Sequence, residues 1–300
     1  MPGMVAVRWI KLASLLTLWA SSFILNEIAL RDLNPAAVVT GRWLVTAVLT
    51  VFLLIRRDQM NEFRGAIRSE FFSFFLLSMV GVTLLYGLQI AGQAHTSAVN
   101  TGLLANTVPI FTALLATIFF GQQVGLAGWI GIVLALVGAW VVSANGFLLD
   151  FDLSTAFGDL LVLLSALMGA FYFVIGGRLL EAYPPLIVTT AAATMGALTL
   201  LPIALVFGGD STLTLPALAA VLILGIGPGL LANLWWWETA EWLTANRAAV
   251  YIYLIPLITM VFAMLFLGET ITQAQLMGTF LVLGGVWLAE RSISSISGEP

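Results

Sequence analysis

The residues best suited to do chemistry in this chain form polar stripes inside long apolar runs. One stripe consists of Thr83, Tyr86, Gln89 and Gln93. Spacings of three, three and four positions put all four on one face of a helix. Amide and phenol groups donate and accept hydrogen bonds, which suits the lining of a ligand pocket. The same groups also join helices to one another, so helix–helix hydrogen bonding remains an alternative.

The elements that carry these stripes are predicted to cross a membrane. The chain has 300 residues, of which 61% are hydrophobic and 9% charged. A soluble domain is roughly 45–50% apolar and about 25% charged, and no soluble fold of this size hides so much apolar surface. The runs are continuous and lack the alternation of a transmembrane β-barrel. The sequence therefore predicts an all-α membrane protein.

Ten apolar runs have the length of a bilayer-spanning helix, which takes about 20 residues. Turn residues separate the runs, for example at Asn34–Pro35 and Gly208–Gly209. The first run also resembles a signal peptide, but its removal would leave nine spans, so we expect it to be retained. The predicted spans are 10–30, 36–55, 71–91, 97–119, 125–143, 158–179, 186–207, 216–237, 244–266 and 272–290.

The two halves of the chain repeat one another. A shift of 147 residues, the difference between positions 256 and 109, places the proline of the ninth span on that of the fourth. The residues that coincide at this shift are Pro109 with Pro256, Gly121 with Gly268, Gly131 with Gly278, Gly138 with Gly285 and Trp140 with Trp287. We therefore predict two five-helix repeats, residues 1–145 and 146–300.

Basic residues predict the orientation of the spans. The loop between the second and third spans carries Arg56, Arg57, Arg64 and Arg68. They lie on the same side as the basic N-terminal residues if both termini are cytoplasmic. Because five spans are an odd number, the second repeat is then inverted relative to the first. Inverted repeats recur in secondary transporters, with the substrate site near the membrane midplane; a stable bundle without transport is the alternative.

Composition excludes several other functions. The chain has no Cys and one His, so we expect no metal site and no cofactor. It has no Gly-rich phosphate loop with a lysine, and its net charge of −4 gives no indication of nucleic-acid binding. An integral membrane enzyme would need clustered His, Asp or Glu. Glycines such as Gly131 and Gly285 let helices approach closely, within a monomer or across a homodimer.

Four short motifs resemble a known family. They are Leu18-Trp19-Ala20-Ser21-Ser22-Phe23, Gly41-Arg42-Trp43, Thr107-Val108-Pro109 and Leu267-Gly268-Glu269-Thr270. Together they resemble the EamA-domain family of the drug/metabolite transporter superfamily, over residues 10–290. The resemblance implies a ten-helix carrier of two EamA units in the bacterial inner membrane, exporting amino acids or other small metabolites. Aromatic amino-acid exporters of the YddG type are one branch.

One position departs from the family pattern. The first-half turn reads Gly121-Gln122, where the family usually has Gly-Glu. If a glutamate in this turn acts in gating or packing, only Glu269 of the second-half turn can provide it.

The resemblance also implies that spans one, three, four, six, eight and nine surround a central cavity. The polar stripes lie on these six spans. Such a cavity is amphipathic with few charges, which suits a small substrate with an apolar part. A multidrug exporter of aromatic cations would need an acidic residue in the cavity, and the sequence shows none at mid-depth. The residues predicted to bind substrate are Trp19, Ser22, Asn26, Tyr86, Gln89, Gln93, Asn100, Tyr172, Asn233, Trp236 and Tyr251.

Three ionisable residues near or within the spans call for an explanation. Glu27 and Arg42 lie about equally far from the turn that joins their helices, so we predict an ion pair. A periplasmic gate or a carboxyl-binding arginine are the alternatives. His95, at the outer end of the fourth span, titrates near neutral pH and is a candidate for proton coupling.

Overall fold

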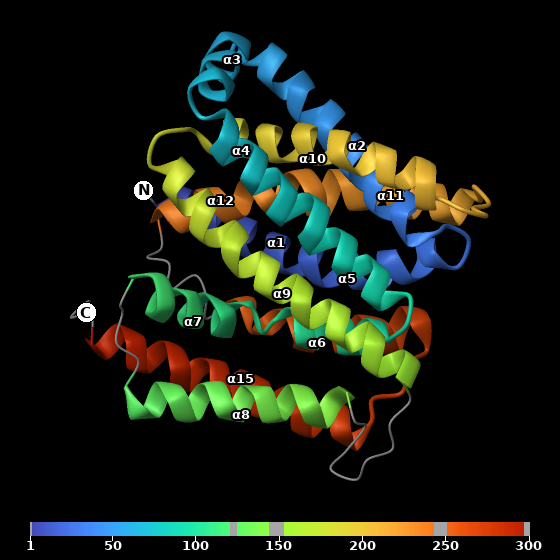
Figure 1. Ribbon diagram of the computed structural model, residues 1–300, viewed down its shortest axis with the longest axis vertical. Coiled ribbons are helices and arrows are strands. Elements are labelled where there is room, and N and C mark those ends of the chain that lie inside the picture. The colour runs from blue at the N-terminus through green and yellow to red at the C-terminus, as the bar shows by residue number, and fades with distance from the viewer. Residues whose placement is uncertain (1, 121–124, 144–152, 243–250, 297–300) are drawn as a thin grey trace.

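The computed structural model describes residues 2–120, 125–143, 153–242 and 251–296, and every regular element in these ranges is a helix (Figure 1). The first half contains α1 (Pro2–Leu30), α2 (Pro35–Arg56), α3 (Met60–Ser69), α4 (Phe71–Ser78), η1 (Met79–Leu84), α5 (Leu85–Gln93), α6 (Ala98–Ala105), α7 (Val108–Phe120) and α8 (Leu126–Ser143). The second half contains α9 (Leu153–Leu180), α10 (Pro185–Phe207), α11 (Leu215–Leu224), η2 (Gly225–Ala232), α12 (Asn233–Trp242), α14 (Leu254–Phe262), η3 (Ala263–Leu267) and α15 (Gln273–Ile296).

Eight of the predicted spans are present as helices long and apolar enough to cross a membrane. They run from Val7–Leu30 through Leu215–Thr239, within a few residues of the first eight predictions. The last two predictions coincide with shorter apolar helices, Leu254–Leu267 and Gln273–Ala289. The structure thus confirms a helical, membrane-type chain, while the total of ten spans stays a prediction. The predicted turn at Gly121–Gln122 and the boundary near residue 145 lie outside the described residues.

The turn residues end the helices where the sequence predicted. Asn34 caps α2: its side-chain oxygen accepts a hydrogen bond from the Ala36 amide at 2.9 Å, and Pro35 begins the helix. Thr214 caps α11 in the same way and also donates to the Asp32 carboxylate at 2.6 Å. These bonds tie the α1–α2 turn to the start of α11, far away in sequence.

Three spans contain a π-helical segment, in which hydrogen bonds skip one residue more than in an α-helix. The 147-residue shift carries Met79–Leu84 (η1) onto residues 226–231, which lie inside η2. The third and eighth spans are therefore irregular at matching positions. Because π segments are frequent at functional sites, these two spans are the first place to look for one.

Helix α1 runs through the middle of the bundle. It packs against α11, η2 and α12 on one side and against α6 and α14 on another. Its side chains Leu15, Ala20 and Asn26 are completely buried. The polar residues Ser22 and Asn26 on this helix therefore face other helices.

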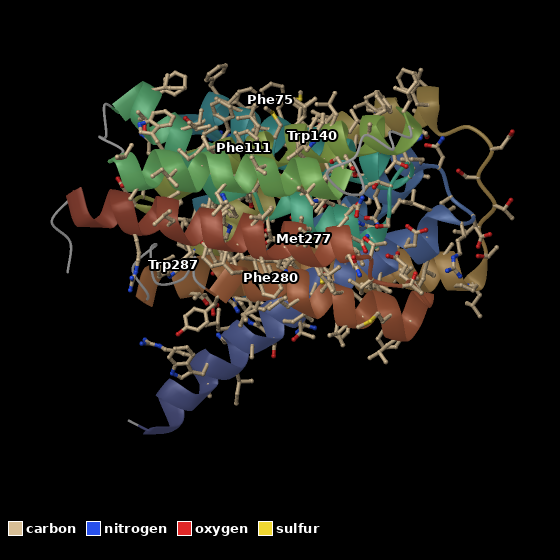
Figure 2. All side chains as sticks on the ribbon, turned by 90° about the horizontal axis from the view of Figure 1, so that it is seen from below. Phe75, Phe111, Trp140, Met277, Phe280 and Trp287 are labelled. Carbon is tan, nitrogen blue, oxygen red and sulfur yellow. The ribbon has the colours of Figure 1, made fainter. Side chains whose placement is uncertain are left out.

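The outer surface of the bundle is apolar. Large side chains such as Trp140, Met277, Phe280 and Trp287 are exposed on α8 and α15 (Figure 2). Exposed apolar surface on this scale marks contact with another apolar phase. On spans of this length, that phase is the lipid of a bilayer.

Helices α8 and α15 lie side by side along their length (Figure 1). Glycines allow this approach: a Cβ on Gly131 would lie 2.5 Å from the Gly285 carbonyl oxygen, and a Cβ on Gly285 would lie 2.5 Å from the Ala135 nitrogen. The close packing that the sequence predicted at these glycines is thus made within one chain. It joins a helix of the first half to one of the second.

Candidate functional site

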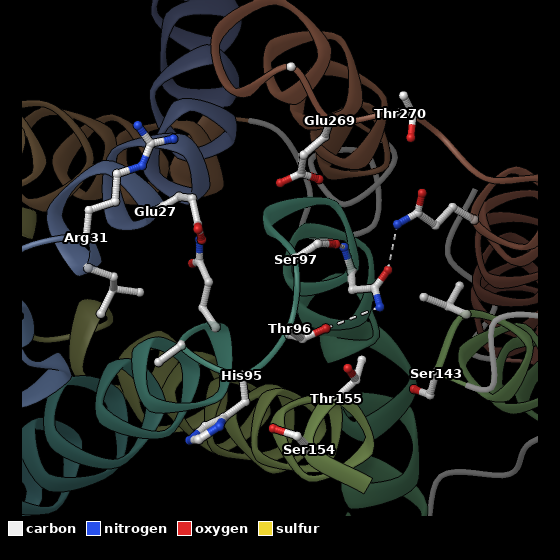
Figure 3. Close-up of a pocket in the computed structure, with 17 residues that line it drawn as sticks. Glu27, Arg31, His95, Thr96, Ser97, Ser143, Ser154, Thr155, Glu269 and Thr270 are labelled. Atoms are coloured by element: carbon white, nitrogen blue, oxygen red, sulfur yellow. Dashed lines mark hydrogen bonds between the residues drawn. The ribbon is translucent and has the colours of Figure 1, made fainter. Parts of the chain in front are cut away.

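A polar cavity of about 1110 Å³ lies where several helix ends meet (Figure 3). It is bounded by the ends of α1, α5 and α8, the starts of α6 and α9, and the turn before α15. Its polar lining consists of Glu27, Arg31, Gln93, His95, Thr96, Ser97, Asn100, Ser143, Ser154, Thr155, Glu269, Thr270 and Gln275. We call this space the polar cavity.

A chain of hydrogen bonds crosses the wall of the polar cavity. Gln275 of α15 donates to Asn100 at 2.9 Å, and Asn100 donates to Thr96 at 3.2 Å (Figure 3). Thr96 in turn donates to the Asp159 carboxylate of α9 at 2.7 Å. The chain connects helices of both halves of the sequence, so a change in their spacing would break it.

Glu269 holds the turn before α15 against the start of α6. Gly268 precedes it with a left-handed φ of 69°, a conformation that glycine adopts without strain. The Glu269 carboxylate accepts a hydrogen bond from the Ala98 amide at 3.3 Å, at a helix N-terminus that favours negative charge. Burial raises the pKa of Glu269, the Ala98 hydrogen bond lowers it, and the charge of Glu27 raises it again. Two carboxylates therefore share the cavity.

The ion pair predicted between Glu27 and Arg42 is wrong. Glu27 is hydrogen-bonded to Gln93 and lies in the field of Arg31. Arg42 points elsewhere: its guanidinium lies over the ring of Tyr86 at 4.5 Å and that of Trp43 at 5.8 Å. Equal depth in the membrane was the basis of the prediction. Depth in the membrane does not determine the direction in which a side chain points. Glu27 points toward Gln93, whereas Arg42 points toward Tyr86.

Seven aromatic side chains meet in the interior of the bundle. Trp236 contacts Trp19 and Phe173, each with ring centroids 5.4 Å apart. Trp43 and Tyr86 make a further contact at 5.1 Å. The helices α1, α2, α5, α9 and α12 supply the members, so both halves of the chain contribute. We call this group the aromatic cluster: Trp19, Trp43, Tyr86, Tyr172, Phe173, Trp236 and Trp237.

Small and polar residues position the aromatic cluster. Gly81, in η1, leaves the space that the Tyr172 ring fills, because a Cβ there would overlap the ring. Asn233 donates to the carbonyls of Pro228 and Gly229 at 2.9 and 3.0 Å, which stabilises the end of η2. Asn233 also lies within hydrogen-bonding reach of Tyr86. Both π segments of the matching spans thus border the cluster.

A model of the EamA-like transporter family matches residues 7–144 and again residues 156–290. The chain belongs to the EamA-like transporter family. It is a membrane transporter of the drug/metabolite superfamily, as the sequence motifs indicated.

Relatives of this EamA-like transporter extend over the whole chain. An uncharacterized transporter of Archaeoglobus fulgidus is 30% identical over 92% of this chain and 95% of its own length. A probable terminal-alkyne amino-acid exporter of Streptantibioticus cattleyicolor is 27% identical over 91% and 90%. One solved crystal structure has a TM-score of 0.68 at 16% identity and covers 95% of this chain and 96% of that one. It shows that the fold is shared.

The predicted site residues of this EamA-like transporter fall into three groups. Trp19, Tyr86, Tyr172 and Trp236 belong to the aromatic cluster, with Asn233 beside Tyr86. Gln93 and Asn100 line the polar cavity. The remaining residues lie elsewhere: Ser22, Asn26 and Gln89 are buried along α1 and α5, and Tyr251 packs on Trp9 at 5.6 Å near the start of α1.

Sequence reasoning missed most of the polar cavity in this EamA-like transporter. Thr155, Thr270 and Gln275 lie at helix ends, where polar residues are ordinary and give no signal. Glu269 was visible as part of a family turn, and His95 as the one histidine. In the aromatic cluster, Trp43, Phe173 and Trp237 were missed, because neighbouring aromatic residues on a helix point in different directions and spacing alone does not tell which of them face the interior.

Proposed function

We propose that this transporter exports small metabolites, above all amino acids with apolar or aromatic side chains, by alternating access between its two repeats. The observation that carries the proposal is the aromatic cluster, in which Trp19 and Tyr86 of the first half meet Asn233 and Trp236 of the second. A site that both halves build is disrupted when they move apart, as alternating access requires. The amino-acid exporter among the relatives supports this substrate class.

In this proposal the repeats, residues 1–145 and 146–300, are inverted, the chain makes ten spans in a bacterial inner membrane, and both termini are cytoplasmic. The polar cavity then opens to the outside, because its helix ends lie opposite the basic loop that contains Asn61. A single cysteine at the exposed position Asn61 tests the orientation, since the chain has none of its own. We expect an impermeant thiol reagent to label it in inverted vesicles and not in intact cells. Labelling in intact cells would refute the orientation.

Transport itself is tested with purified protein in liposomes. The vesicles are loaded with labelled phenylalanine, leucine, serine, glutamate and glucose 6-phosphate. Release is compared with that from liposomes that carry the same load but contain no protein. We expect phenylalanine and leucine to leave fastest, because the aromatic cluster offers apolar contact area. Release of none of the five, from vesicles with demonstrated insertion, would contradict the proposed substrate class.

A second function has one specific observation in its favour. Glu27 and Glu269 both line the polar cavity, and a carboxylate in a cavity is what export of aromatic cations would use. Adding labelled tetraphenylphosphonium to the liposome panel separates the two functions. Release of this cation and of no amino acid would establish drug export instead.

A further inference from the structure

Arg42 is the buried group that the fold satisfies least. Its side chain is 0% exposed. Its Nε atom and both Nη atoms have no hydrogen-bond partner among the described residues. A buried guanidinium that is neither paired nor hydrogen-bonded is strongly unfavourable. Such groups in native proteins call for an explanation, commonly an ion or ligand that completes the site.

The surroundings of Arg42 supply aromatic rings in place of an anion. The faces of Tyr86 and Trp43 attract the cation at 4.5 and 5.8 Å. They do not accept the in-plane N–H groups of the guanidinium. The helices packed against α2 are α10, η2, α5, α11, α1 and α3, and the ionisable group that acts on Arg42 from them is Tyr86. Glu27 of α1 is engaged with Gln93 instead.

Other hydrogen-bond donors are also unmatched, both beside Arg42, at Trp43, and elsewhere in the aromatic cluster. The indole N–H groups of Trp19, Trp43 and Trp236 are shielded from solvent and have no partner in the described part of the chain. All of them donate, and none accepts. Trp43 contacts Tyr86, and Asn233 links Tyr86 to the helix of Trp236. The aromatic cluster therefore has a surplus of donors and needs an acceptor.

We propose that Arg42 binds the carboxylate of the transported substrate, and that the substrates of this protein are small monocarboxylic acids with an apolar or aromatic body. A carboxylate offers acceptor oxygens in a plane, which match the fork of a guanidinium with two parallel hydrogen bonds. Its single charge balances the single buried cation. Trp19, Phe173 and Trp236 then provide the apolar walls for the rest of the molecule.

This inference rests on the proposed function, because it assigns one substrate group to Arg42, which contacts the aromatic cluster. The two can fail separately. Transport is measured by movement across a liposome membrane, whereas the role of Arg42 is measured by binding to purified protein. If a carboxylate binds through Arg42 but does not cross the membrane, the proposed transport is refuted, while the proposed binding site stands.

The binding experiment uses four probes of similar shape on purified protein in detergent. L-phenylalanine and 3-phenylpropionate carry a carboxylate, whereas L-phenylalaninamide and phenethylamine do not. We expect the first two to raise the unfolding temperature of the wild-type protein in a saturable way, and the other two to have no effect. This comparison needs no variant, so it does not depend on the folding of an altered protein.

Variants of Arg42 test whether binding of the carboxylate probes depends on this arginine. Arg42→Lys keeps the charge but not the planar fork, and Arg42→Gln removes the charge. Each should weaken phenylalanine binding roughly tenfold or more, the usual loss for a charged hydrogen bond. Arg56→Gln is the matched control on the same helix, because Arg56 also lies over a ring, that of Phe52 at 5.1 Å, but is exposed. It should bind phenylalanine as the wild type does.

Three results would overturn the proposal. The first is equal stabilisation of the wild type by phenylalanine and its amide, or stabilisation by no probe. The second is stabilisation by chloride at the same concentration as phenylalanine, which would make the site one for small inorganic anions. The third is unchanged phenylalanine binding in Arg42→Lys or Arg42→Gln.

Discussion

The polar cavity and the aromatic cluster satisfy their polar groups in opposite ways. In the polar cavity, Asn100 and Thr96 take part in a continuous hydrogen-bond chain, and carboxylates are present. These groups have hydrogen-bond partners within the protein, although the buried Oδ2 atom of Asp159 at the end of the chain has none among the described residues. In the aromatic cluster and beside it, the indoles of Trp43 and Trp236 and the guanidinium of Arg42 have no acceptor among the described residues. A ligand with acceptor atoms would satisfy these unmatched donors, so Arg42 and the adjacent cluster are the stronger candidate for substrate binding.

Two buried amide side chains join α1 to α5 beside the polar cavity. Asn26 of α1 donates to Gln93 of α5 at 3.3 Å, and Gln93 donates to the Phe23 carbonyl at 2.6 Å. Gln93 lines the polar cavity, whereas Asn26 lies two turns beyond Trp19 on the same helix. We infer that this pair, which we call the partition, separates the polar cavity from the aromatic cluster.

Substitution of Trp236 is the most direct test of whether the aromatic cluster binds substrate. We expect Trp236→Ala to lower phenylalanine transport at least about tenfold, because a contact of this size is lost, while the protein still reaches the membrane. The measurement is release from liposomes at matched protein content. Trp129→Ala is the control, since Trp129 is 46% exposed on the outer face of α8. Equal transport by both variants would mean that the cluster is packing only.

Removing the partition should join the two regions. In a protein with a single cysteine at Ser22, which is buried next to Trp19, we expect slow reaction with a small thiol reagent. Adding Gln93→Ala opens a route from the polar cavity, so labelling should become faster. Thr83→Ala, on the same span but away from the partition, serves as control. An unchanged rate in the Gln93 variant would show that another group closes the route.

Glu269 gives the polar cavity a pH dependence. Because its pKa in the folded protein is raised above the ordinary value of 4.5, the folded state holds its proton more tightly than the unfolded state. Stability from this group is present below pH 4.5 and is lost as pH rises through the raised pKa. Glu27, Arg31, His95 and Asp159 also surround the site.

The Glu269→Gln variant isolates this contribution. The unfolding temperature of the wild type should fall relative to that of the variant as pH rises above 4.5. Thermal unfolding in detergent at several pH values measures it. Parallel curves for the two proteins at all pH values would show that Glu269 does not titrate in this range.

The smallest effect is expected outside both regions. Lys11 and Glu238 form an ion pair at 2.6 Å, but their side chains are 37% and 44% exposed. Exposed pairs contribute at most about 1 kcal/mol. Lys11→Met should therefore change the free energy of unfolding by less than that and leave transport intact. A large loss of transport would show that this end of α1 also takes part.

The sequence predicts the apolar helices and several members of the aromatic cluster, because helical periodicity is a local property. Trp19, Tyr86 and Trp236 were found from helical spacing. Thr83 was placed on the stripe of Tyr86, yet its hydroxyl pairs with Thr199 of α10. The reason is η1, which ends between them: a π turn contains an extra residue and rotates the positions before it relative to those after it.

The environment of Arg42 and the polar cavity depend on contacts between distant segments. No local pattern tells which face of α2 meets α5, so the depth of Arg42 suggested Glu27 when the true neighbour is Tyr86. The polar cavity is made of six helix ends brought together by the fold. Its residues follow no common spacing, and only the assembled bundle identifies them as neighbours.

The glycine contact between α8 and α15 has a consequence for how the protein is made. A ribosome releases Gly131 well before Gly285, so α8 enters the membrane without the helix that it will touch backbone to backbone. Until then the glycine face of α8 lacks the helix that covers it in the complete chain, and we expect this face to be open to a chaperone or a protease of the membrane. Chains that stop before α15 should therefore be degraded, and synthesis of α15 is the step that commits the whole bundle to its mature form.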